Sequence, residues 1–103
     1  MLIADVPFTE GNRRKVRPVV VLSSSDHNLV RRDIVTAKIS GSEASGFWEM
    51  DIDRWAQFGL QKPSKVVCDH LISVSKTSVR RVGRLDFRTA VGIRRTVKTL
   101  LGL

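Results

Sequence analysis

The chain has 103 residues, enough for one domain with a modest core, and its 42% of apolar residues argues against a disordered protein. It carries a net charge of +8, no apolar run near the roughly 20 residues that cross a bilayer, and no signal-peptide pattern at its start. A single cysteine, Cys68, cannot form an internal disulfide, so we expect one soluble, cytoplasmic domain over residues 1–103 with no membrane partner.

Short apolar or alternating segments predict a mainly β protein. We expect strands at residues 2–6, 17–23, 33–39, 47–52 and 65–74, and a short edge strand at residues 79–85. The fifth of these is expected to bend or split near Asp69 and His70. Between the strands we expect a flexible basic loop at residues 8–16, a polar turn at 24–32, a loop at 40–46 and one helical turn at 53–59.

The last segment changes its period and predicts a helix. Asp86 is a good N-cap residue. Apolar residues then recur at steps of three and four, at Phe87, Ala90, Val91, Val97, Leu100 and Leu101. Five or six short strands with a terminal helix are closed most economically by a small, strongly curved β-barrel.

Arg17 is the most informative residue of the chain. It stands directly before Pro18, which restricts it to extended geometry, and before the apolar run Val19–Leu22. A guanidinium at such a rigid strand end can bind a phosphate through two parallel hydrogen bonds. The charge distribution also favours a polyanion partner, because residues 76–103 hold eight basic residues against one acidic residue. A solvated basic surface without a partner is the alternative.

Six segments of the chain occur in the order and spacing of a known family. They are Val6–Gly11, Arg17–Ser23, Asp33–Ser40, Gly59–Ser64, Val67–Leu71 and Gly83–Leu85. In these segments the chain resembles the MazF/PemK/Kid toxins of bacterial type II toxin–antitoxin pairs. The resemblance implies an SH3-like barrel with a C-terminal α-helix, a homodimer, and an acidic antitoxin as protein partner. It further implies a sequence-selective endoribonuclease that cleaves single-stranded RNA without a metal or other cofactor.

The resemblance also assigns catalytic residues. The family's catalytic arginine falls on Arg17, its hydroxyl residue at the end of the third strand falls on Ser40, and an acidic residue of one branch falls on Asp69. That branch has an arginine two residues before the acid, where this chain has Val67. In cleavage by the RNA 2′-hydroxyl, Arg17 would stabilise the charge on phosphorus and Ser40 would hold a phosphate oxygen. Asp69 would accept the 2′-proton.

Basic residues near Arg17 are candidates for RNA contacts. Arg13, Arg14 and Lys15 would contact the RNA backbone, and His70 would contact RNA or serve as an acid or base. No Cys/His cluster has metal-ligand spacing and the carboxylates are scattered, so we expect no metal site.

Each candidate also has a structural alternative. Arg17 could be a solvated strand residue, Ser40 a loop hydroxyl, and Asp69 a strand terminator. Two other functions stay open: a non-catalytic nucleic-acid-binding module on the same barrel, and a gyrase-poisoning toxin like CcdB, which shares the fold. The Arg-Pro pair fits the ribonuclease branch, and the chain lacks a CcdB-like Trp-Gly-Ile ending.

Overall fold

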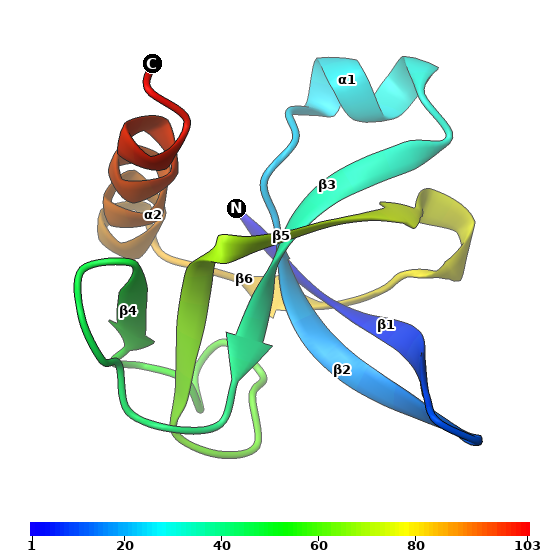
Figure 1. Cartoon of the computed structure of the whole chain (residues 1–103), viewed down its shortest axis with the longest axis horizontal. Helices are drawn as coiled ribbons and strands as arrows, with labels where there is room; N and C mark the ends of the chain where they lie inside the picture. The colour runs from blue at the N-terminus through cyan, green and yellow to red at the C-terminus, as the bar shows by residue number, and fades with distance from the viewer.

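The computed structural model describes all residues from Met1 to Leu103 and has one six-stranded antiparallel sheet (Figure 1). The elements are β1 (Leu2–Glu10), β2 (Arg13–Val21), α1 (Ser25–Val30), β3 (Asp33–Ser40), β4 (Glu49–Ile52), β5 (Ser64–Ser75), the 3-10 turn η1 (Lys76–Ser78), β6 (Arg80–Arg84) and α2 (Phe87–Leu100). The strands lie in the order β4-β5-β3-β2-β1-β6. The sheet curls into a half-barrel with α2 packed at one side, which confirms the predicted mainly β fold with a C-terminal helix.

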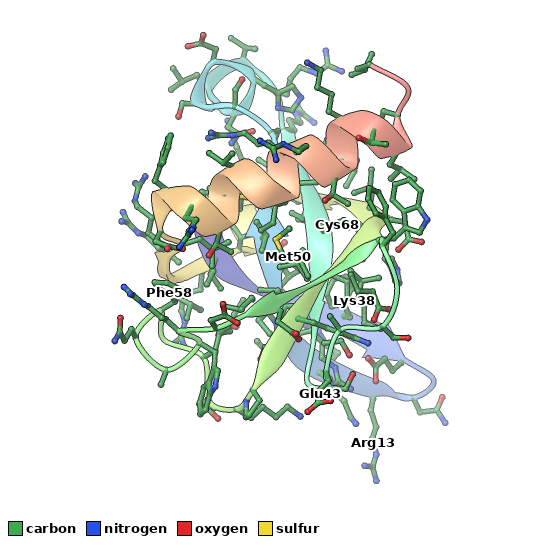
Figure 2. All side chains as sticks on the ribbon, turned by 90° about the vertical axis from the view of Figure 1, so that its left-hand side faces the viewer. Arg13, Lys38, Glu43, Met50, Phe58 and Cys68 are labelled. Atoms are coloured by element: carbon green, nitrogen blue, oxygen red, sulfur yellow. The ribbon has the colours of Figure 1, made fainter.

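The sheet buries apolar side chains on both of its faces. One cluster includes Val20 of β2, Cys68 of β5 and Ile93 of α2. The other cluster includes Val19 and Val21 of β2. Because consecutive residues of a strand point to opposite faces, the valine run of β2 serves both clusters. This explains why its apolar run is continuous rather than alternating. Figure 2 shows Cys68 beneath α2.

The first two strands are longer than the sequence analysis predicts. Residues 8–16 do not form a flexible loop, because β1 and β2 stay paired from Ile3 opposite Val20 to Glu10 opposite Arg13. A two-residue turn joins them, with Gly11 at a positive φ of 61° in the first turn position, where glycine is favoured. The outer hairpin projects into solvent, so its strands need no apolar face. The polar sequence of residues 8–16 is therefore typical of a loop as well as of an exposed hairpin.

Strand β5 bends as predicted. Ala37 of β3 pairs with Leu71, but the next residue, Lys38, pairs with Val67. Residues 68–70 therefore form a bulge without partners on β3, which changes the direction of the side chains on either side of it.

Two other element boundaries differ from the prediction. The polar segment 24–32 contains α1, which Ser24 caps by accepting a hydrogen bond from the His27 backbone N–H, and the strand predicted at residues 47–52 begins at Glu49.

Helix α2 packs through a narrower stripe than predicted. Ala90, Ile93 and Thr96 are its buried residues. Phe87 and Leu101, which the apolar spacing placed in the stripe, are 80% and 54% exposed. Phe87 lies in the first turn, and Leu101 lies beyond the last turn, so neither contributes to the buried core. Neither helix of the protein is long and apolar enough to span a membrane.

Replacing Asp86 by alanine should lower the melting temperature by a few degrees, because the Asp86 carboxylate accepts a hydrogen bond from the Thr89 backbone N–H. The side chain of Thr89, and then its backbone N–H, lower the pKa of Asp86, so the cap stabilises the fold above the ordinary carboxyl pKa and is lost as the pH falls through the lowered value. Asp86→Asn, which keeps the cap oxygen, should melt close to wild type at neutral pH and lose less stability in acid. Thermal melts of wild type and the two variants at two pH values test this. Equal melting temperatures of Asp86→Ala and wild type at neutral pH would contradict it.

Candidate active site

The principal cavity of the protein opens where β2 and β3 separate. Their pairing ends at Val19 opposite Lys38, and the same register, if continued, would place Arg17 opposite Ser40. The β1–β2 hairpin, the end of β3, part of β5 and the segment 59–64 enclose about 930 Å³ of open space there. Its polar lining includes Glu10, Arg17, Lys38, Ser40, Lys62 and His70.

Arg17 is held at the cavity by an ion pair across the hairpin. Its Nε donates to Oε1 of Glu10 at 3.2 Å, and its Nη2 donates to Oε2 at 3.1 Å. The two side chains are 44% and 46% exposed, so the pair lies at the surface of the cavity and not in the core. The hydrogen bonds from Arg17 lower the pKa of Glu10, and the same bonds raise the pKa of Arg17. Both groups are therefore fully charged at neutral pH.

Three of the predicted site residues line this cavity together: Arg17, Ser40 and His70. Asp69 does not line it. This residue is exposed and lies in the bulge of β5, next to His70.

The three predicted backbone-binding residues, Arg13, Arg14 and Lys15, are also exposed but lie outside the cavity lining. They belong to the outer part of β2 rather than to a flexible loop. Figure 2 shows Arg13 pointing away from the body of the molecule at the end of the hairpin.

The sequence does not single out four other charged residues of the cavity lining, which are Asp5, Glu10, Lys38 and Lys62. Glu10 contacts Arg17 only because the hairpin extends to residue 10, which its polar sequence concealed. Lys38 could have been found, because it lies two residues before Ser40 and so shares its face of β3. The flexible end of Lys62 lies where a Cβ of residue 41 would be, so a side chain in place of Gly41 would displace it.

Other reactive groups of the chain are not placed for catalysis. Cys68 is fully buried, and burial raises the pKa of its thiol to about 11, so it is protonated and unreactive at neutral pH. No three His, Cys, Asp or Glu side chains lie close enough together to share a metal ion.

The fold belongs to a known class of proteins. Residues 1–101 match the family model of the PemK-like, MazF-like toxins of type II toxin–antitoxin systems. The chain therefore belongs to this family, which confirms the resemblance seen in its segments. No curated protein sequence matches the chain significantly.

Solved structures share the whole fold. The Mycobacterium tuberculosis toxin MazF-mt6 superposes with a TM-score of 0.83 at 21% identity, covering 100% of this chain and 98% of that chain. A MazE-MazF structure (Form-III) from Deinococcus radiodurans gives 0.81 at 19% identity, covering 99% and 94%. An endoribonuclease in complex with its cognate antitoxin, from a mycobacterial species, gives 0.79 at 17% identity, covering 97% and 92%.

Proposed function

We propose that this family member is an endoribonuclease that cleaves single-stranded RNA by attack of the RNA's own 2′-hydroxyl. The observation that carries the proposal is the exposed guanidinium of Arg17 at an open cavity that also holds Ser40 and His70. A guanidinium buried against a carboxylate would have argued against a nuclease. The partner of Arg17 is instead a half-exposed side chain of the same cavity.

The charges of the cavity suit a phosphodiester. Cleavage adds negative charge to the non-bridging phosphate oxygens, and fixed cations at that position lower the barrier. Arg17 is the residue that we assign to this role, and Ser40 can donate a hydrogen bond to one of these oxygens. Lys38 and Lys62 add positive charge to the lining and can hold the neighbouring phosphates. His70 also lines the cavity and can contact a base or ribose of the same strand.

We also propose an acidic antitoxin, a homodimer and a cytoplasmic location. One of the neighbouring structures is described as an endoribonuclease in complex with its cognate antitoxin, and another holds MazE with MazF. In this chain, the basic excess of residues 76–103 would attract an acidic, disordered segment that folds on binding. A small acidic protein encoded beside this one would support the pairing, and its absence would weaken the toxin role without affecting the nuclease chemistry.

Purified protein incubated with a long RNA of mixed sequence and excess chelator should cut the strand at a small set of sites. Replacing the nucleotide before a mapped cut by its 2′-deoxy form should abolish that cut, because the nucleophile is removed. The fragments should carry a 2′,3′-cyclic phosphate and a 5′-hydroxyl, which mass spectrometry distinguishes.

Two results would contradict the nuclease proposal. An RNA that is bound in a salt-sensitive manner but stays intact would indicate a binding module. Cutting of an all-deoxy strand would indicate an external nucleophile instead of the 2′-hydroxyl.

A further inference from the structure

The ion pair of Arg17 leaves part of its guanidinium free. A guanidinium has five N–H donors, and Glu10 takes one from Nε and one from Nη2 along a single edge. The structure has no other side-chain acceptor on Arg17, so both N–H groups of Nη1 and the second of Nη2 are free. Arg17 can therefore bind a phosphate end-on, through Nη1 and Nη2, while it keeps Glu10 on its side edge.

This arrangement brings a carboxylate beside the reacting phosphate. The side edge and the free end of the guanidinium share Nη2, so the two anions that they bind are neighbours. We propose, on the basis of the proposed nuclease function, that Glu10 is the catalytic residue that accepts the proton of the attacking 2′-hydroxyl.

The surroundings of Glu10 keep its carboxylate in the ionised form that can accept a proton. Arg17 and Lys15 of β2 and Lys38 of β3 lower the pKa of Glu10. At neutral pH Glu10 is therefore ionised and can accept a proton, but it is a weaker base than an unpaired carboxylate. The same cations offset the repulsion between the carboxylate and an incoming phosphate. Asp69, the acceptor that the family resemblance suggests, lines no part of the cavity, and it makes no ion pair with Arg17. Asp5 also lines the cavity, but its carboxylate lies 3.6 Å from Nη2 of Arg80. Glu10 is therefore the carboxylate in contact with Arg17.

The step balances without any further reactant than water. The Glu10 carboxylate takes the 2′-proton as the 2′-oxygen forms its bond to phosphorus. The bond from phosphorus to the 5′-oxygen then breaks, and that oxygen takes a proton from water. The products are the 2′,3′-cyclic phosphate and the 5′-hydroxyl, and Glu10 returns its proton to solvent.

The test compares Glu10→Gln with two other carboxylate variants on one short RNA that contains a mapped cut site. Glu10→Gln keeps the size of the side chain but removes its basic oxygen, so kcat should fall about 10²-fold or more. Binding of the uncleavable 2′-deoxy strand should stay equal to wild type or become tighter, because a negative charge is removed beside the phosphate. Glu43→Gln, an exposed residue of the β3–β4 connection outside this cavity, should change neither quantity. Asp69→Asn tests the competing acceptor and should retain most of the activity.

Several outcomes would overturn this assignment alone. Unchanged or faster cleavage by Glu10→Gln would show that Glu10 only competes with phosphate for Arg17. A loss of binding equal to the loss of kcat would show that Glu10 shapes the site without accepting a proton. Loss of cleavage in Asp69→Asn with normal cleavage in Glu10→Gln would return the role to Asp69. Wild-type protein that leaves the RNA intact would instead overturn the proposed nuclease function, and this assignment with it.

Discussion

Arg17→Ala should lower kcat/KM for RNA cleavage about 10³-fold or more, because it removes the only cation that we assign to the reacting phosphate. The fold should be unaffected. Arg17 is 44% exposed, and Glu10, left without its partner, is almost half in solvent. Single-turnover cleavage of one RNA oligonucleotide measures the first effect, and urea unfolding measures the second.

Arg17→Lys separates charge from geometry. A lysine keeps the positive charge but lacks the planar guanidinium group. It therefore cannot form paired hydrogen bonds with the Glu10 carboxylate or with two phosphate oxygens. We expect cleavage between the alanine variant and wild type. Arg88→Ala, an exposed arginine of α2 outside the cavity, is the matched control for a lost charge. Cleavage by Arg17→Ala within a few fold of the control would contradict the role of Arg17.

The sheet was largely predictable because burial gives strands a clear pattern. The valine run of β2 and the alternation of β3 identified two central strands, and Asp86 located the start of α2. The outer part of the β1–β2 hairpin was not predicted, because strands that are exposed on both faces have no apolar pattern. Its turn residue Gly11 was present in the sequence, but polar residues on each side of it are equally typical of a loop.

The site was predictable only where the residues lie on the predicted strands. Arg17 is singled out by its position before Pro18, and Ser40 by the family resemblance, which places a hydroxyl residue at the end of the third strand. Glu10 could not be assigned, since its contact with Arg17 depends on the register of a hairpin that was not predicted. The bend of β5 near Asp69 and His70 is predicted, but the pattern does not show which residues the bulge leaves unpaired, so the different environments of these two side chains could not be predicted.

Gly83→Ala should destabilise the fold by about 1–3 kcal/mol, the typical cost of overpacking, because the new methyl group would collide with a backbone atom. Gly83 lies on β6 where its pairing with β1 shifts register, and a Cβ there would overlap the carbonyl oxygen of Phe58. A backbone carbonyl cannot rotate away as a side chain can, so β6 or the segment after Phe58 must move. That segment continues into Gly59 and Leu60 of the cavity lining, and cleavage should therefore fall as well.

Gly92→Ala is the matched control for this substitution, since its Cβ would meet only the flexible end of Met50. It also gains up to about 1 kcal/mol of helix propensity within α2, so its stability should be equal to wild type or higher. Urea unfolding of both variants measures the difference, with cleavage measured under conditions where each is folded. If both variants unfolded at the wild-type midpoint, the contact between β6 and the Phe58 carbonyl would not constrain the fold. If Gly83→Ala lost stability but cleaved normally, the cavity wall would tolerate movement that its contacts with β6 argue against.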